Sequence, residues 1–234
     1  MFVLFGTSHI AVVTAILSVA LALIAVVRVW GGVRLARTIR WTLATVLIFT
    51  WVLWFLLLYE EGWASIATLL PMNLCDWAAI VVVITLIRPN QRTYELAYFW
   101  ALGGTTLALL TPDLAVDFPD PRYVVFFALH GGVVVAALLF TLGLRMRPWP
   151  SSIPRVVAWS LVYLGIATAV NGLFDTNFGY LVAKPIQPSL LDYFAPWPYY
   201  LGEETLLACA IIALLYAPFV LQDRFAARRD LHGK

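Results

Sequence analysis

Charged side chains are scarce in this chain of 234 residues. Asp, Glu, Lys and Arg make up 12% of the sequence, whereas hydrophobic residues make up 62%. Soluble domains carry roughly 25% charged residues, which cover the surface that faces water. The shortage excludes an ordinary soluble globular protein and predicts a polytopic membrane protein.

Cysteine and lysine are also rare, and their positions exclude further classes. Both cysteines, Cys75 and Cys209, fall inside apolar runs, so a framework of structural disulfides is not expected. Neither Lys184 nor Lys234 falls inside such a run, which excludes a retinal protein with a Schiff-base lysine in a transmembrane helix. The sequence has no histidine pair at metal-ligand spacing and no glycine-rich phosphate loop, so neither a metal nor another cofactor is expected. The net charge of +2 comes without a basic cluster, so a nucleic-acid partner is not expected either.

Apolar windows of about 20 residues, the length that crosses the hydrocarbon core of a bilayer, recur along the whole chain. Seven such windows predict seven transmembrane helices and leave little room for a soluble domain. We therefore expect a single all-α membrane helix bundle over residues 1–234. The expected spans are 8–30, 41–59, 66–87, 94–112, 122–144, 154–175 and 199–221.

The positive charges indicate how these spans are oriented. If the spans alternate in direction, thirteen of the fifteen Lys and Arg residues fall on one side, and only Arg122 and Lys184 fall on the other. Cytoplasmic loops are enriched in Lys and Arg, so the N-terminus is expected outside and the C-terminus in the cytoplasm. Because arginines follow the first span and none precedes it, we expect that span to be a helix of the protein and not a signal peptide. The thirteen residues are Arg28, Arg34, Arg37, Arg40, Arg88, Arg92, Arg145, Arg147, Arg155, Arg224, Arg228, Arg229 and Lys234.

Two of the outer loops are long for a compact bundle. One covers residues 111–122 and the other covers 176–198, and both contain several prolines. Loops of this length in compact proteins tend to be lids or binding segments. Because the second loop is rich in Leu, Tyr, Phe and Trp, we expect it to lie on the outer membrane surface or to fold over the bundle.

Most polar and ionisable residues of the expected spans fall at a similar depth. At ~1.5 Å per helical residue, Asn73, Cys75 and Asp76 lie roughly 10–15 Å below the outer boundary and His130 lies about 12 Å below it. Such residues are costly in hydrocarbon and usually mark a functional site. Their convergence predicts an outward-facing polar cavity, with little comparable polarity in the cytoplasmic half. The set also includes His9, Asn171, Asp175, Glu203 and Glu204.

Cys75 and His130 form the most specific candidate pair. An imidazole at the depth of a thiol can accept its proton and so create a nucleophile, while a carboxylate such as Asp76 can hold the imidazole in one tautomer. Each residue also has an ordinary structural interpretation. Cys75 is a small side chain suited to packing, and His130 can hydrogen-bond a neighbouring helix. Asp76 can instead form a structural bond to Asn171 or Tyr200.

Further polar residues line the expected mouth of the cavity. Asn171 and Asp175 are four residues apart and share a helix face, where they can bind a lipid headgroup or simply cap the end of the helix. In an acyl transfer, Asn73 or Asn171 is a candidate to stabilise the oxyanion. Glu203 and Glu204 begin the last span, where their charge suits the positive end of the helix dipole. The candidate substrate-binding residues are Asn73, Asn171, Asp175, Asn177, Tyr200 and His9.

Three short sequences together carry a resemblance to a known family. They are LPMNLCD at 70–76, FALHG at 127–131 and NGLFDTNFG at 171–179. In this combination the chain resembles the YwaF-like bacterial integral membrane proteins over most of its length. That family is similar to a eukaryotic transmembrane acyltransferase that remodels ether phospholipids. The resemblance implies a multi-pass protein of the bacterial inner (plasma) membrane in which Cys75 and His130 carry the chemistry.

One position departs from the motif of that family. Where the family's Leu-Pro-Leu-His-Leu-Cys-Asp motif has a histidine, this chain has Asn73. Asparagine donates and accepts hydrogen bonds but is not a base at neutral pH, so no base is expected at this position. Cys75 and Asp76 match the motif.

Residues and resemblance together indicate a membrane-embedded lipid acyltransferase or transacylase, or a hydrolase of acyl lipids, that needs no cofactor. Its expected partner is a membrane phospholipid or another acyl lipid. A different class stays open, namely a transporter or lipid-binding protein whose Asp76 and His130 form a protonatable site. A third alternative is a structural subunit whose polar cluster only specifies helix packing.

Overall fold

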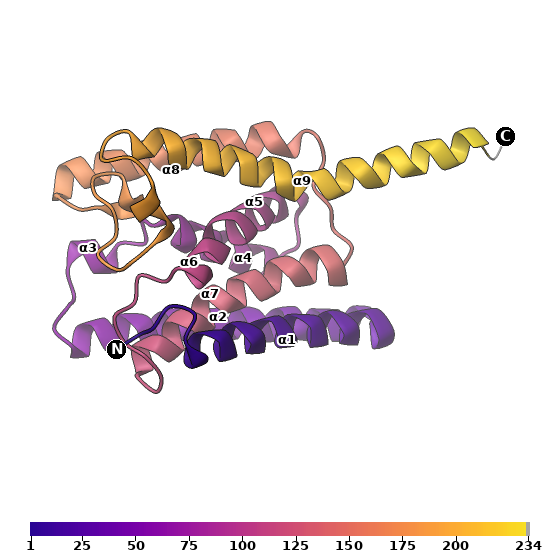
Figure 1. The fold of residues 1–234 in the computed structure, drawn as a ribbon. Coiled ribbons are helices and arrows are strands. Elements are labelled where there is room, and N and C mark those ends of the chain that lie inside the picture. Colours follow the sequence, from indigo (N-terminus) through magenta and orange to yellow (C-terminus); the bar gives the residue numbers. More distant parts are fainter. Residues whose placement is uncertain (233–234) are drawn as a thin grey trace.

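The computed structural model describes residues 1–232, with side chains up to residue 227, and the regular structure of this part is entirely helical (Figure 1). Within it, five helices are long and apolar enough to cross a membrane. The prediction of an all-α, multi-pass membrane protein is therefore confirmed. The predicted number of seven spans is not confirmed, because five of the described helices meet the criteria of length and composition. The five are α1 (Thr7–Trp30), α2 (Val33–Glu60), α7 (Pro121–Leu138) with its π-helical continuation η2 (Leu139–Gly143), α8 (Ser152–Phe174) and most of α9 (Tyr200–His232).

The expected span 66–87 is not one continuous helix. A single turn, α3 (Ile66–Leu69), is followed by non-helical chain, and the helix resumes as α4 (Leu74–Ile87). The break has a local cause, because Pro71 lacks the N–H of the helical ladder and pushes Leu70 into extended geometry, with ψ at 127°. At ~1.5 Å per residue, the 14 residues of α4 reach only about 21 Å, less than the thickness of a typical hydrocarbon core.

The expected span 94–112 forms the centre of the bundle. It comprises α5 (Gln91–Trp100), a π-helical segment η1 (Ala101–Thr105) and α6 (Thr106–Leu110), which follow one another without a break. Every residue from 94 to 100 is buried, so this part of the run is covered by protein on all sides. The segment is not among the five helices that are long and apolar enough to cross a membrane.

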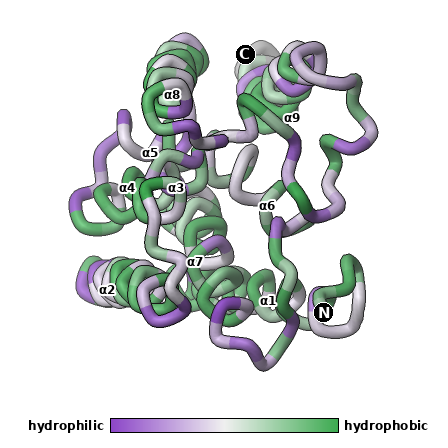
Figure 2. Tube along the Cα trace, turned by 90° about the vertical axis from the view of Figure 1, so that its left-hand side faces the viewer, coloured by the Kyte–Doolittle hydropathy of each residue, from purple (hydrophilic) through white to green (hydrophobic). Residues whose placement is uncertain are grey.

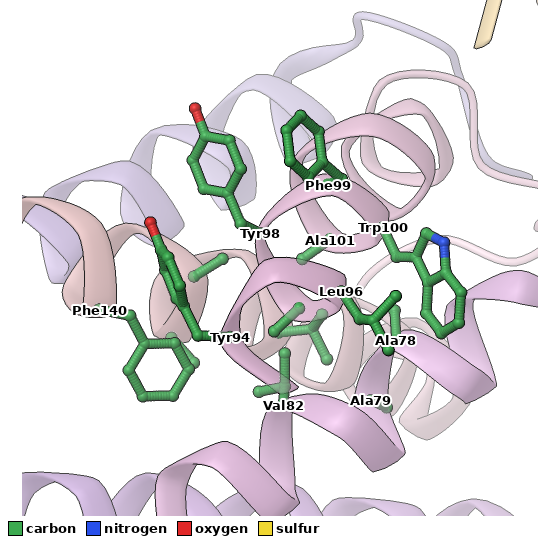
Figure 3. Close-up of a cluster of buried hydrophobic side chains, with 14 of the residues drawn as sticks. Ala78, Ala79, Val82, Tyr94, Leu96, Tyr98, Phe99, Trp100, Ala101 and Phe140 are labelled. Atoms are coloured by element: carbon green, nitrogen blue, oxygen red, sulfur yellow. The ribbon is translucent and has the colours of Figure 1, made fainter. Parts of the chain in front are cut away.

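The helices lie in three layers. Figure 1 shows α8 and α9 on one side, α4, α5 and α6 in the middle, and α7, α1 and α2 on the other side, and Figure 2 shows the same layers end-on. The main core cluster joins small residues of α4 to aromatic residues of α5 (Figure 3). Ala78 lies beside Leu96 and Trp100, whereas Tyr94 packs against Phe140 of η2 (Figure 3). Small side chains such as Ala78 and Ala79 are what lets helices approach closely inside a membrane.

Large apolar side chains cover the outside of the long helices. Five of them, on α1, α8 and α9, are between 62% and 72% exposed. A continuous apolar surface of this kind is unfavourable in water and natural in lipid. The exposed side chains therefore support the placement of the bundle in a membrane. The five are Leu21, Val29, Leu161, Leu206 and Leu214.

Two of the arginines expected on one side of the membrane contact helix ends at the same end of the bundle. The Arg28 guanidinium donates to the Leu142 carbonyl at 2.7 Å, and Arg40 donates to the Leu86 carbonyl at 3.0 Å. The end is thus defined by contacts between helices, while the side of the membrane that it faces stays a prediction. Three of the thirteen basic residues lie outside the described side chains, namely Arg228, Arg229 and Lys234.

This basic end also holds a buried charge that the sequence analysis missed. Glu95 is 1% exposed, and its carboxylate receives two hydrogen bonds from Arg155, each 2.9 Å long. Gln91 donates a third bond to the same carboxylate at 3.0 Å. The expectation of little polarity in this half was therefore wrong. The interior tolerates the Glu95 carboxylate because its charge is fully paired.

The long loop 176–198 folds over the opposite end, which is one of the two placements expected for it. It contains the short helices η3 (Phe178–Tyr180) and η4 (Leu190–Tyr193). Phe178 is buried, and the Tyr180 hydroxyl donates to Asp113 of the other long loop at 3.0 Å. The first turn of α4 lies at this loop-covered end.

Candidate functional site

The site begins where the chain re-enters a helix at the start of α4. Asn73 is the N-cap residue, with φ at −80° and ψ at 154°. Its backbone N–H donates to the Asp76 carboxylate at 2.9 Å, and its carbonyl accepts from the Asp76 N–H at 3.0 Å. A carboxylate at this position also suits the positive end of the helix dipole. Asp76 thus caps α4, and within the described residues it has no hydrogen bond to any of the partners expected from the sequence.

Cys75 lies in this capped first turn. It is a free thiol with a partly exposed side chain in the N-terminal turn of α4. The thiolate is the reactive form of cysteine, so a nearby base is needed to take its proton. Cys209, by contrast, is an exposed residue of α9.

His130 projects from α7 with its tautomer set by the backbone. Its Nδ1 is 2.8 Å from the carbonyl oxygen of Phe126, and the ring stacks on the Phe126 ring at a centroid distance of 4.1 Å. A carbonyl can only accept, so Nδ1 carries the proton and Nε2 presents a lone pair. The Phe126 carbonyl therefore orients the imidazole, a role that the sequence suggested for Asp76.

Cys75 and His130 belong to α4 and α7, two helices that pack against each other. Ala79, one turn beyond Cys75, and Val133, about one turn beyond His130, belong to the same buried cluster. Each candidate residue therefore precedes, by about one turn, a residue of the core that the two helices share. Among the residues that the structure describes, no hydrogen bond joins the two side chains.

The glycines beside His130 have a packing role. A Cβ added at Gly131 would lie 2.6 Å from the Cδ1 atom of Ile16 on α1, and one added at Gly132 would lie 2.7 Å from the Cδ2 atom of Leu47 on α2. The missing side chains therefore let α1 and α2 pack against α7. At these two glycines the structure thus shows the close approach of neighbouring helices.

Tyr163 of α8 belongs to the site but was not identified from the sequence. Its ring packs edge-on against Trp77 of α4, with centroids 5.4 Å apart, and the residue is 4% exposed. A Cβ added at Gly179 would lie 2.6 Å from the Tyr163 hydroxyl oxygen, so this hydroxyl lies directly against η3. It has no hydrogen-bond partner among the described residues, and Cys75 and Asp76 are within electrostatic range of it. A single tyrosine in an apolar span carries no local signal that would have revealed this.

Glu204 and Tyr180 complete the polar group around this hydroxyl. Glu204, in the first turns of α9, is within electrostatic range of Tyr163, and Tyr180 of η3 is within electrostatic range of both Tyr163 and Cys75. Burial, together with the charge of Asp113, raises the pKa of Tyr180, so its hydroxyl stays protonated and donates to Asp113.

The adjacent Glu203 has a different role from Glu204. Its carboxylate accepts the Ala195 N–H at 2.8 Å and so ties the end of the long loop to α9. The two glutamates, which were expected to act alike at the helix start, therefore contact different parts of the protein.

Asn171 and Asn177 use their amide groups to shape the loop. Asn171 is buried, and its side chain bonds to the hydroxyl of Thr176 and to both backbone groups of Phe178, at 2.7–3.0 Å. The Asn177 amide donates to the Ala183 carbonyl at 2.8 Å. The structure thus places these two candidate substrate-binding residues in a scaffolding position.

His9 and Tyr200 are also held by backbone groups. The His9 ring is buried, its Nδ1 accepts the Phe5 N–H at 3.0 Å, and its Nε2 donates to the Leu109 carbonyl at 2.8 Å. Tyr200 is fully buried and donates its hydroxyl to the Tyr180 carbonyl. Both side chains therefore connect the loop-covered ends of helices.

Asn73 and Asp175 differ in how their side chains are used. The Asn73 Oδ1 atom accepts the Gly179 N–H at 3.2 Å, which fastens η3 to the start of α4. Asp175 ends α8 in the left-handed conformation, with φ at 53°, and its side chain is exposed. Of the six candidate substrate-binding residues, Asp175 is the one whose polar side chain faces outward.

The described residues hold no group of three or more His, Cys, Asp or Glu side chains arranged to bind a metal ion. The polar atoms gathered at the start of α4 are the Cys75 thiol, the N–H groups of its first turn and the Tyr163 hydroxyl, while His130 lies on the neighbouring helix α7. A thiol next to several hydrogen-bond donors is an arrangement suited to nucleophilic attack on a carbonyl group.

Comparison with known proteins gives one match. No curated protein and no solved structure matches this chain. The TMEM164 family, in contrast, matches residues 4–216, which include the site and all helices from α1 to the middle of α9. The chain therefore belongs to the TMEM164 family.

Proposed function

We propose that this TMEM164-family protein is a membrane-embedded lipid acyltransferase or transacylase, with hydrolysis as the variant in which water is the acceptor. The observation that carries the proposal is the position of Cys75, a free and partly exposed thiol in the N-terminal turn of an interrupted helix that packs against α7, the helix of His130. The same proposal counts α4 and the run from α5 to α6 as the sixth and seventh spans. It puts the N-terminus outside the inner membrane of a bacterium, in line with the resemblance to YwaF-like proteins.

His130 acts as the base in the first step. The thiol proton of Cys75 moves to Nε2, and the sulfur bonds to the carbonyl carbon of an acyl ester. The ester C–O bond then breaks, and the leaving alkoxide takes the proton from His130. The products of this step are a thioester on Cys75 and a lysolipid.

The second step transfers the acyl group. His130 accepts the proton of an acceptor hydroxyl, whose oxygen attacks the thioester carbonyl. The C–S bond breaks, and the sulfur of Cys75 regains the proton. Catalytic hydrogen bonds are often long in unliganded enzymes and tighten with substrate, which fits a pair on neighbouring helices without a hydrogen bond.

The lipid reaches Cys75 through the break between α3 and α4. All residues from 70 to 77 are partly exposed, so the turn that bears the thiol is open on one side. The headgroup lies at the loop-covered end, where the exposed Asp175 is the candidate contact.

The transporter alternative draws less support. It needs Asp76 and His130 as one protonatable site, but Asp76 bonds to the Asn73 backbone and His130 bonds to the Phe126 carbonyl. Each group therefore has its own local partner.

The test uses the purified full chain in phospholipid nanodiscs with a fluorescent acyl phospholipid and a lysolipid acceptor. We expect Cys75→Ala and His130→Gln to abolish acyl transfer, and mass spectrometry to find a hydroxylamine-sensitive acyl adduct on Cys75 of the wild-type protein. Cys209→Ala is the matched control, because it removes the other thiol from an exposed position on α9, and it should keep full activity. Acyl transfer at the wild-type rate by Cys75→Ala would refute the proposal.

A further inference from the structure

The hydroxyl of Tyr163 is a buried donor without a partner. The residue is 4% exposed, and no acceptor bonds to this oxygen within the described residues. A buried hydroxyl that has lost its hydrogen bonds to water without gaining a partner destabilises the fold, so its presence needs an explanation.

The hydroxyl lies at the N-terminus of α4. It is next to Gly179, whose N–H is bonded to the Asn73 side chain at the helix start. The Leu74 N–H, at the first position of α4, lies near the same hydroxyl without forming a hydrogen bond to it. Cys75 is the next residue of α4.

The first N–H groups of α4 also lack acceptors. The Asn73 carbonyl accepts the N–H groups of Asp76 and Trp77, at 3.0 and 3.3 Å, and the Asn73 side chain is used by Gly179. Nothing in the described part of the chain accepts the N–H groups of Leu74 and Cys75. Helix N-terminal N–H groups of this kind bind negative oxygen atoms.

We infer that Tyr163 and the first two N–H groups of α4 form the oxyanion-binding site of the acyl transfer, an inference that rests on the proposed function. When Cys75 attacks the ester carbonyl, the carbonyl oxygen becomes negatively charged next to the sulfur. The Tyr163 hydroxyl and the N–H groups of Leu74 and Cys75 donate to this oxygen. The unsatisfied hydroxyl is thus a donor held ready for a charge that exists only during the reaction.

This assignment replaces the candidates from the sequence. The Asn73 Oδ1 atom accepts the Gly179 N–H, and the Asn171 Nδ2 group donates to the Phe178 carbonyl. Both amides are engaged in holding the loop, whereas the Tyr163 hydroxyl is not engaged.

The test compares two reactions of Cys75 in the full chain in nanodiscs. Acylation by a p-nitrophenyl ester passes through an oxyanion, whereas alkylation by iodoacetamide does not. We expect Tyr163→Phe to lower the acylation rate about 100- to 1,000-fold, the usual effect of removing one oxyanion donor, with alkylation unchanged. Tyr98→Phe is the matched control, because it removes a buried hydroxyl that donates to Leu215, away from Cys75, and both rates should stay at the wild-type value.

The outcomes distinguish failure of the oxyanion-site inference from failure of the proposed function. Acylation of Tyr163→Phe at the wild-type rate overturns the inference, and so does an equal fall of acylation and alkylation, which would indicate a structural role. If Cys75→Ala abolishes acyl transfer while Tyr163→Phe does not change it, only the oxyanion site is wrong. If Cys75→Ala retains acyl transfer, the proposed function itself is wrong.

Discussion

Asn171 and Phe178 bond to each other in both directions. The Asn171 Nδ2 group donates to the Phe178 carbonyl at 3.0 Å, and the Phe178 N–H donates to the Asn171 Oδ1 atom at 2.7 Å. This reciprocal pair holds the end of α8 to the loop that follows it. Since Gly179 comes next and contacts both Asn73 and Tyr163, the position of the site depends on the pair.

Replacing Asn171 should loosen this loop. Asn171→Ala leaves the buried backbone groups of Phe178 without partners, so we expect a loss of about 2–4 kcal/mol in unfolding free energy. Thermal unfolding in detergent measures the loss, and hydrogen exchange should become faster over residues 176–180. Asn177→Ala is the control, because its bonds lie in an exposed part of the loop where water replaces them. Equal destabilisation by both variants would contradict the special role of Asn171.

Gly179 should not tolerate a side chain, for two separable reasons. Its φ of +66° strains any L-residue, and an added Cβ would lie 2.6 Å from the Tyr163 hydroxyl oxygen. Gly62 has a similar φ of +71° with open space around it, so Gly62→Ala measures the strain alone. We expect Gly179→Ala to lower the melting temperature more than Gly62→Ala does.

A second substitution tests the contact itself. The double variant Gly179→Ala with Tyr163→Phe removes the oxygen that the new Cβ would meet. It should therefore recover part of the lost melting temperature. No recovery would show that the hydroxyl is not the obstructing group.

The buried ion pair of Glu95 and Arg155 at the basic end should destabilise the fold when one partner is removed and the other stays. Arg155→Met leaves the Glu95 carboxylate buried without its counter-ion, for which we expect about 3–5 kcal/mol of destabilisation. The double variant Glu95→Met with Arg155→Met should be more stable than Arg155→Met alone. Asp223→Asn serves as control, because Asp223 is 55% exposed in its pair with Arg147 and should change stability by only ~0–1 kcal/mol.

The start of α7, which Asp120 caps, should lose stability in acid. Two hydrogen bonds from the Arg122 guanidinium lower the pKa of Asp120 to about 2. In the unfolded chain this pKa is about 3.9, so the stabilisation is complete above about pH 4 and disappears as the pH falls towards 2. Asp120→Asn keeps an N-cap acceptor but not the charge. We expect the difference in melting temperature between wild type and Asp120→Asn to shrink from pH 6 to pH 3, and a difference independent of pH would contradict this.

The break at Pro71 illustrates what was readable from local sequence. Because proline removes one N–H and restricts the preceding residue, an interruption near Cys75 follows from the chain itself. The length of the interruption does not follow from local sequence. The chain leaves the helix for four residues, and the break is accompanied by a hydrogen bond between Asn73 and Gly179, which are 106 positions apart.

The sequence alone determined the class of this protein, an all-α multi-pass membrane protein. Whether a segment enters the membrane depends on its apolar composition over about 20 residues and on the charges that flank it. Contacts with residues far away in the sequence are not needed for this. Only the tertiary structure decided which polar atoms are engaged. Hydrogen-bond partners depend on how separate helices pack, and that packing turned Asn171 into a loop clamp and left the Tyr163 hydroxyl without a partner beside Cys75.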